Sequence, residues 1–418
     1  MIESIGGIIK LNRIQNELTL KYVSYKTGLS KGYLSRVERN KEGISFENVQ
    51  KIFSLMGIEF STEKIDEKFE NDFYQFINDV IYMKDFEKSF LKLKVYEKNI
   101  YSSFSYIKYL LAEMIYNINI YDSINITDYF YIEEYFDYLE SYQIVLFYDY
   151  IGVYFYYNNL HTEAIMYYDK AMMYKGNQYS SAMLNYHKSI SLTCIERLTE
   201  AFDCAIQARE SFCEQLNLRR LVSISFQIAV IYCHMRNYKK SEEINLKCIE
   251  MFEELQMQKS VISTYNNLFW DYICAQEYNK ILSKKDEALL RSNNDVRILF
   301  YISFAYYQLN NLSLAKKYIK KAKNNISSIS DQYFIDIIQA FYVLLSDSSY
   351  KRKEKKLFNV YKTSKKIQNI QTTLFILEII KDFYKKYNKQ DKYIQCLEKL
   401  NKSYKQIDYS FIFDENIG

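Results

Sequence analysis

Proline is absent from all 418 residues of this sequence. It is the strongest helix breaker among the amino acids, because its ring fixes φ and removes the backbone N–H donor. Glycine is also rare, at 9 residues. Sandwiches and barrels of β-strands need many turns rich in glycine and proline, and nucleotide-binding folds use glycine-rich loops. The composition therefore disfavours both classes and predicts an almost entirely helical chain.

Hydrophobic residues make up 49% of the chain and charged residues 25%, which predicts a globular protein with a core rather than a disordered one. No apolar run reaches the ~18 residues of a membrane span. The first residues, Met1–Gly6, lack a charged segment followed by an apolar one, so no signal peptide is predicted. We therefore expect a cytoplasmic protein with no membrane partner.

Sequence signals for catalysis, metal binding or cofactor binding are missing. The chain has no P-loop, GxGxxG or HExxH motif. Its three histidines, His161, His187 and His234, are dispersed, and none of its seven cysteines stands in a CxxC pair. We expect no enzyme activity, no metal and no cofactor, and we interpret the cysteines as small buried apolar residues.

Glycine is concentrated at the start of the chain, and this divides the sequence into regions. Six of the nine glycines lie in the first 57 residues, where short helices joined by tight turns need them. We predict a small compact domain over residues 1–60, a linker helix with a first degenerate helix pair over 61–100, and a repeat domain over 101–418.

Local signals predict four short helices in the first domain. They are expected over residues 5–16, 20–27 and 31–39 and from residue 46 onward. Thr19, Ser30 and Ser45 each stand where an N-cap is needed. Gly28 supplies the positive φ that ends the second helix, and Asn40 tolerates the left-handed conformation after the third. The fourth helix has the apolar stripe Phe46, Val49, Ile52, Phe53 and Met56.

This segment resembles the phage-repressor type of helix-turn-helix, the XRE or Cro/C1 family. The resemblance lies in Leu18-Thr19, Thr27–Ser30, Leu34–Glu38 and Ile44-Ser45. In that family the third helix enters the major groove of DNA. The resemblance implies DNA contacts by Thr19, Ser30, Lys31, Gly32, Tyr33, Ser35, Arg36 and Arg39. It also implies a buried structural ion pair between Arg13 and Glu38.

One departure from the family pattern keeps an alternative open. Leu20 replaces the glutamine that often begins the second helix, so one DNA contact is missing. The alternative is a helix-turn-helix that has lost DNA binding and serves dimerisation. Lys31, Arg36 and Arg39 favour DNA binding, because cations at these positions can contact phosphates.

The remainder of the chain carries an internal repeat. A helix ending in aromatic residues, a short polar link and a helix with small residues recur along it. Equivalent anchors fall at Ser89, Ala164, Ala201, Ser241, Ile281, Ala315 and Tyr393, which span 304 residues over eight units of about 38. The pattern resembles the tetratricopeptide repeat, best in Tyr148, Ile151, Gly152, Phe155, Ala164, Tyr168 and Ala171. We predict an all-α fold: a helix-turn-helix followed by a right-handed solenoid of helix pairs.

The first helices of such pairs line a concave face, on which related proteins bind peptides. Counting back from the anchors predicts peptide contacts at Tyr186, Phe226, Asn266, Trp270, Arg297, Phe304 and Tyr307. An Asn side chain can pair with both groups of a peptide backbone, and an Arg can hold a carboxylate. The alternative is that these aromatic residues only pack between neighbouring helices.

The end of the chain is basic. Residues 350–409 hold sixteen Lys and Arg against six Asp and Glu. This is either a second surface for a polyanion or a solvated lysine face, and the near absence of arginine favours the second.

The order of the two regions resembles the RRNPP family, the group of Rgg, PlcR, PrgX, NprR and AimR. These are cytoplasmic regulators of Gram-positive bacteria and their phages. The resemblance implies a homodimer that binds a double-stranded DNA operator and a short signalling peptide in quorum sensing. Two alternatives remain: an adaptor whose repeats bind another regulatory protein of a phosphorelay or sporulation pathway, with DNA binding secondary, and a phage-type repressor with no peptide ligand.

Overall fold

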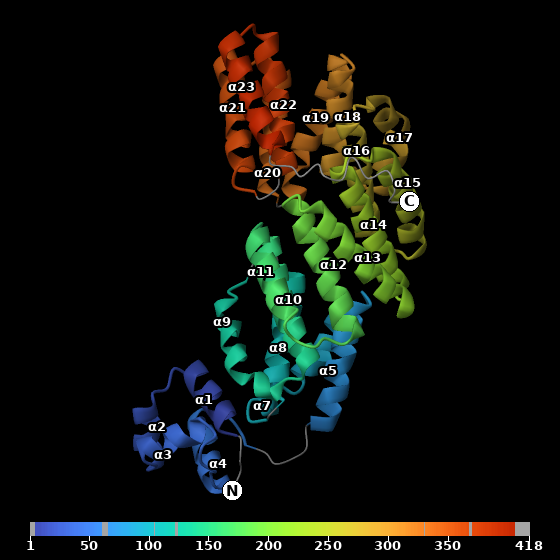
Figure 1. Ribbon diagram of the computed structural model, residues 1–418. Helices are drawn as coiled ribbons and strands as arrows, with labels where there is room; N and C mark the ends of the chain where they lie inside the picture. Colours follow the sequence, from blue (N-terminus) through green and yellow to red (C-terminus); the bar gives the residue numbers. More distant parts are fainter. Residues whose placement is uncertain are drawn as a thin grey trace. The chain divides into compact units, whose positions relative to one another are not determined.

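The computed structural model describes residues 5–60, 66–103, 105–121, 124–329, 331–367 and 370–405. Within these ranges the chain forms α-helices and the 3-10 helices η1 (Tyr131–Tyr138) and η2 (Ile326–Ser328), with no β-strand (Figure 1). No helix in the described ranges combines the length and the apolar composition needed to cross a membrane. The predicted all-α fold is confirmed.

The chain divides into two compact units. The first unit is Met1–Asn158 with Tyr167–Ser181, and the second unit is Asn159–Met166 with Ala182–Gly418. The first unit contains α1 (Gly6–Gln15), α2 (Leu20–Thr27), α3 (Lys31–Glu38), α4 (Phe46–Leu55), α5 (Asp66–Ile81), α6 (Phe86–Lys94), α7 (Glu97–Ile100), α8 (Tyr106–Ile120), α9 (Thr127–Phe130), η1 and α10 (Ser141–Tyr157). Helix α11 (His161–Ala171) contributes to both units.

Helices α1 to α4 have the predicted boundaries to within one or two residues. The hydroxyls of Thr19, Ser30 and Ser45 accept hydrogen bonds from backbone N–H groups three residues on, at 3.2, 3.2 and 3.3 Å. Gly28 has φ of 74° and Asn40 has φ of 52°, so both helix ends adopt the predicted left-handed conformation.

The predicted apolar stripe of α4 is partly wrong. Val49, Ile52 and Phe53 are buried, but Phe46 is 42% exposed and Met56 is half-buried. Phe46 lies at the first turn of α4 and packs against the ring of Phe60 at 5.3 Å, outside the core.

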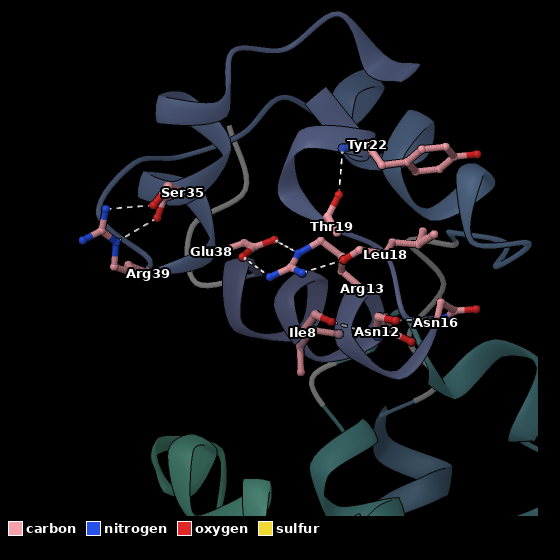
Figure 2. Close-up of polar contacts among 10 residues, drawn as sticks. All are labelled: Ile8, Asn12, Arg13, Asn16, Leu18, Thr19, Tyr22, Ser35, Glu38 and Arg39. Atoms are coloured by element: carbon pink, nitrogen blue, oxygen red, sulfur yellow. Dashed lines mark hydrogen bonds and ion pairs between the residues drawn. The ribbon is translucent and has the colours of Figure 1, made fainter. Parts of the chain in front are cut away.

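The predicted ion pair of the first domain is confirmed. Arg13 donates from Nε and Nη2 to the two carboxylate oxygens of Glu38, at 2.6 and 3.0 Å (Figure 2). A third nitrogen donates to the carbonyl of Leu18 at 2.7 Å. Both side chains of the pair are largely buried, so this two-pronged contact ties α1 to α3.

Helices α1 and α3 also approach closely at Gly6. A Cβ placed on Gly6 would lie 1.7 Å from the backbone carbonyl oxygen of Val37. That oxygen belongs to the main chain of a helix and cannot rotate away, so only glycine fits at this position.

Gly6→Ala should therefore destabilise the protein, by about 1–3 kcal/mol as is typical of overpacking. Gly32→Ala is the matched control, because the nearest atom to its Cβ is the flexible end of Arg36 at 3.6 Å. Urea unfolding followed by circular dichroism measures both. Equal midpoints for the two variants would contradict the close approach at Gly6.

The second unit consists of successive helix pairs. They are α12 (Gln178–Cys194) with α13 (Leu198–Glu214), α14 (Leu218–His234) with α15 (Tyr238–Glu254), α16 (Gln258–Cys274) with α17 (Tyr278–Arg291), α18 (Val296–Gln308) with α19 (Leu312–Asn324), α20 (Gln332–Leu345) with α21 (Tyr350–Ser364), and α22 (Ile370–Lys386) with α23 (Gln390–Tyr404). The anchors Ala201, Ser241, Ile281 and Ala315 are fully buried in the second helix of their pairs, whereas Tyr393 is only half-buried.

The links between paired helices use left-handed residues that are not glycine. Arg236, Gln276 and Asn310 have φ of 60°, 59° and 60°. After each of them, the next backbone N–H bonds back to the carbonyl five residues earlier, as Asn237 does to Tyr232 at 2.8 Å. This is the Schellman arrangement, which satisfies helix-end carbonyls. It ends the helices of a chain that has no proline and little glycine.

A buried carboxyl lies in the core of the second unit. Oδ2 of Asp271 lies 2.7 Å from Oγ of Ser241 and 2.9 Å from Nδ2 of Asn245. Ser241 Oγ also lies 2.8 Å from the carbonyl oxygen of Ala229, which can only accept. One hydroxyl proton cannot serve both acceptors well, so a proton on Asp271 completes the set. Burial raises the pKa of Asp271 to about 7.

This raised pKa predicts a pH-dependent stability. The unfolded Asp has a pKa near ~3.9, so between this value and about 7 the folded protein binds more protons and loses stability as pH rises. Asp271→Asn removes the titration and should flatten the dependence, whereas Asp286→Asn on the surface should not. Urea unfolding between about pH 5 and pH 7.5 measures it. Parallel curves for wild type and Asp271→Asn would overturn the assignment.

Candidate DNA-binding surface and repeat-unit pocket

The predicted DNA-contacting residues gather on and around α3. Lys31, Gly32, Arg36 and Arg39 are exposed, as are the cap residues Thr19 and Ser30 of the turns before α2 and α3, while Tyr33 and Ser35 are half-buried. Leu34 and Val37 are buried on the opposite side of the helix. The surface therefore presents three cations and two helix N-termini, which are groups that bind phosphate.

The arginines of this surface already have intramolecular partners. Arg36 Nε lies 2.6 Å from a carboxylate oxygen of Glu42, and both side chains are exposed. Arg39 donates to the backbone oxygen and to the hydroxyl of Ser35, both at 2.9 Å (Figure 2). Exposed contacts of this kind contribute little stability, so a phosphate can replace them at small cost.

The hydroxyl of Tyr33 is turned towards the protein. It donates to the carbonyl of Gly43 at 3.2 Å. Burial, with a contribution from Glu42, raises the pKa of this hydroxyl. The ring of Tyr33, rather than its hydroxyl, is therefore the part of the side chain that can contact a bound duplex.

The first helix of the domain is attached to later helices of the first unit. Asn12 Nδ2 donates to the carbonyl of Tyr101 at 2.7 Å, and Gln15 Nε2 donates to the hydroxyl of Tyr131 at 2.8 Å. A Cβ on Gly7 would lie 2.9 Å from the hydroxyl oxygen of Tyr138. Attachment through α1 leaves the cations of α3 exposed.

The second unit contains a cavity of about 580 Å³. Its lining comes from the first helices α14, α16 and α18, from the starts of α15 and α17 with the links before them, and from α22 and the end of α23. Trp270 and Phe304 form its aromatic side with Phe375 of α22, whose ring centroid lies 5.0 Å from that of Trp270 and 5.2 Å from that of Phe304. Volumes of this size are typical of ligand pockets.

Polar contacts hold α22 beside the other helices of the cavity. Glu196, the left-handed residue between α12 and α13, accepts from Gln371 at 3.2 Å and lies 2.9 Å from Nδ1 of His234. Asp382 also lines the cavity, and burial raises the pKa of its carboxyl. The cavity therefore combines an aromatic side with a rim of amides and charges.

The predicted peptide contacts are not all brought together. Trp270 and Phe304 line the cavity. Asn266 lies one turn before Trp270 on α16, and its buried Oδ1 has no hydrogen-bond partner among the described residues. Arg297 is engaged by Asp331 at 3.4 Å and by the ring of Phe334 at 5.1 Å, so a ligand carboxylate would have to compete for it.

Of the other three predicted contacts, Tyr186 and Tyr307 pack against neighbouring side chains. Tyr186 lies against Phe212 and under the guanidinium of Arg220, which is 5.6 Å from its ring centroid. Tyr307 packs edge-on against Phe341 at 5.4 Å. Phe226 is half-buried in α14. None of the three stands among the residues that line the cavity.

The side of the cavity that α22 and α23 form was not predicted from the sequence. Its lining residues include Gln371, Phe375, Glu378, Asp382 and Tyr404. A signal was present: the same counting rule, fifteen and eleven positions before the anchor Tyr393, gives Glu378 and Asp382.

The cysteines differ in part from the prediction. All seven are free thiols, and Cys204, Cys233, Cys248 and Cys396 are buried as expected. Cys213 is exposed and Cys194 and Cys274 are half-buried, which the prediction did not expect. The described part of the chain contains no cluster of His, Cys, Asp and Glu able to hold a metal ion.

Comparisons with known proteins agree with this division of the chain. Residues 9–62 match a family model described as helix-turn-helix. The structure of a Rap protein complexed with competence and sporulation factor superposes with a TM-score of 0.67 at 14% identity, over 81% of this chain and 98% of that one. Residues 9–62 thus match the helix-turn-helix family, and the fold of the chain is similar to that of the Rap protein.

Two further solved structures share this fold. Aspartyl phosphate phosphatase F from Bacillus subtilis has a TM-score of 0.57 at 15% identity, over 84% of this chain and 97% of that one. NprR in complex with its cognate peptide NprX has a TM-score of 0.53 at 13% identity, over 82% and 98%. No curated protein matches the sequence. Identities this low establish a common fold, and function has to be argued from the sites.

Proposed function

We propose that this protein is a transcriptional regulator whose helix-turn-helix binds an operator and whose repeat unit binds a short signalling peptide that alters operator binding. The observation that carries the proposal is one chain with two binding surfaces: exposed cations on α3 and an aromatic cavity in the repeats. NprR, with the same fold, was solved with its cognate peptide. We further propose that the protein acts as a cytoplasmic homodimer and has no enzyme activity.

Two features of the second unit support a peptide as the ligand. Asn266 offers a buried amide oxygen with no partner among the described residues, which a backbone N–H of an extended peptide would satisfy. Trp270 and Phe304, on one side of the cavity, offer apolar surface for a large side chain. A peptide supplies both kinds of group at short spacing.

A second candidate is an adaptor whose repeats bind another regulatory protein. The observation that favours it is that Arg36 and Arg39 of α3 already have partners within the protein, Glu42 and Ser35. In this case the helix-turn-helix would contribute little to regulation. The two candidates differ in whether the cations of α3 are required.

DNA binding is tested first. Arg36→Ala with Arg39→Ala should abolish binding to a duplex selected from a randomised library by the full-length protein. If some binding remains, the logarithm of its affinity should fall less steeply with the logarithm of the salt concentration, because roughly two phosphate contacts are lost.

Lys88→Ala with Lys92→Ala is the matched control, since it removes two exposed charges from α6 of the same unit. Fluorescence anisotropy over a salt series measures all three proteins. Regulation in cells that survives the Arg36 and Arg39 changes would favour the adaptor.

Peptide binding is tested with a pooled library of synthetic heptapeptides, scored by thermal shift and by the emission of Trp270, which is the only tryptophan. Asn266→Ala should weaken a selected peptide by about 1–3 kcal/mol, the cost of a lost hydrogen bond to a buried group. Asn324→Ala, on the surface of α19, should leave its affinity unchanged. Equal affinities for the two variants would remove Asn266 from the site.

A further inference from the structure

A second, smaller cavity adjoins the one described above. It has a volume of about 120 Å³, and its lining comes from α16, α18, α20 and α22 and from the end of α14. Four residues line both cavities: His234, Trp270, Gln371 and Phe375. The two cavities are therefore neighbours, and these four side chains lie at their boundary.

Aromatic rings make up most of the lining of the small cavity. The rings belong to Trp270, Phe300, Tyr301, Tyr333, Phe334 and Phe375. Ile337 of α20 adds an aliphatic side chain, and it is buried. A charged group placed against such a lining would lose its water without gaining a partner, so the lining favours an apolar group.

Polar groups of the lining are engaged within the protein. The hydroxyl of Tyr333 donates to the carbonyl of Thr372 at 2.9 Å. Nδ1 of His234 lies 2.9 Å from a carboxylate oxygen of Glu196, and Gln371 donates to the same oxygen at 3.2 Å. Because these groups already have partners, the cavity offers mainly apolar surface to a ligand.

Contacts between the rings fix the walls of the small cavity. The ring centroid of Phe300 lies 6.2 Å from that of Phe334 and 6.3 Å from that of Phe375, and both pairs meet edge to face. On α20, Phe334 also lies under the guanidinium of Arg297, at 5.1 Å. Edge-to-face packing is a favoured arrangement of aromatic rings. The protein itself therefore sets the size of the cavity.

The size of the small cavity selects the group that fits it. An apolar cavity of about 150 Å³ binds benzene, which has six carbon atoms. A cavity of about 120 Å³ suits the four carbons of a leucine or isoleucine side chain. Larger rings would overpack it. Burial of such an aliphatic group against aromatic walls is favourable, because it removes apolar surface from water.

We propose that the small cavity is an apolar subsite that takes one branched aliphatic side chain, while the backbone that bears this side chain lies in the larger cavity. The assignment of this side chain to the signalling peptide rests on the proposed function. The subsite then makes one position of the peptide selective for leucine or isoleucine.

The first test titrates the full chain with N-acetyl-leucinamide and follows the emission of Trp270, which lines both cavities and is the only tryptophan. The change should be saturable. N-acetyl-asparaginamide has a side chain of similar shape, and it should bind roughly tenfold or more weakly because its amide would be buried without a partner. N-acetyl-phenylalaninamide should also bind more weakly, since its ring is too large.

The second test changes the size of the subsite. Ile337→Phe narrows it and should weaken binding of N-acetyl-leucinamide roughly tenfold or more, through overpacking. Ile394→Phe is the matched control, because it makes the same change at an exposed position of α23 and should leave binding unchanged. Ile337→Ala enlarges the subsite and should reverse the preference, so that the phenylalanine probe binds more tightly than the leucine probe.

This reversal distinguishes a subsite from a general loss of stability, and thermal unfolding followed by circular dichroism checks that each variant is folded. Equal binding of the three probes to the wild-type protein would overturn the proposal. The same order of preference in wild type and Ile337→Ala would also overturn it.

The outcome is separable from that of the proposed function. If the leucine probe binds as predicted but no heptapeptide binds, the apolar subsite stands and its signalling role fails. If a heptapeptide alters DNA binding and binds equally well to wild type and Ile337→Phe, the proposed function stands and the subsite fails.

Discussion

The repeat unit depends on how its helices end. Without proline and with little glycine, the chain ends the first helices of its pairs, except α20, by placing an ordinary residue in the left-handed region, at a cost of about 1–2 kcal/mol per residue. Arg236, Gln276 and Asn310 share this conformation, and Schellman hydrogen bonds follow each of them. The recurrent turn gives successive pairs a similar geometry. As a result Trp270 of α16 and Phe304 of α18 reach the same cavity, where Phe375 of α22 meets them.

The helix-turn-helix depends on a different kind of contact. Its core is small, and the pair Arg13–Glu38 and the glycine at position 6 hold α1 against α3. The other side of α1 is bonded through Asn12 and Gln15 to later helices of the first unit. Helix α1 is thus shared between the recognition domain and the helices that follow. A change in those helices has a direct mechanical route to α3, and a coupling of about 1–3 kcal/mol suffices for a useful switch.

The sequence predicted the parts of this structure that depend on local chemistry. Thr19, Ser30 and Ser45 cap helices because a hydroxyl at that position satisfies a free N–H whatever surrounds it, and Gly28 and Asn40 end helices for similarly local reasons. Phe46 was expected in the core, but its exposure depends on where Phe60 lies, which no local pattern records. Likewise Arg297 was expected to be open to a ligand. Arg297 instead contacts Asp331 and Phe334 of the next helix pair, and the local sequence does not record such a contact between distant residues. The contribution of α22 to the cavity was missed, although the spacing from Tyr393 pointed to Glu378 and Asp382.

The central claim is that one ligand site in the repeats and one DNA site on α3 are energetically linked. The most direct measurement is the dissociation constant of a selected peptide, read from Trp270 emission, with and without saturating operator duplex. Linkage requires DNA to change the peptide affinity by the same factor by which the peptide changes the DNA affinity, on the order of 5–150-fold for ordinary allosteric coupling. A change in peptide affinity of at least about fivefold on adding DNA is the predicted result. A peptide affinity that is unchanged by DNA would contradict the account.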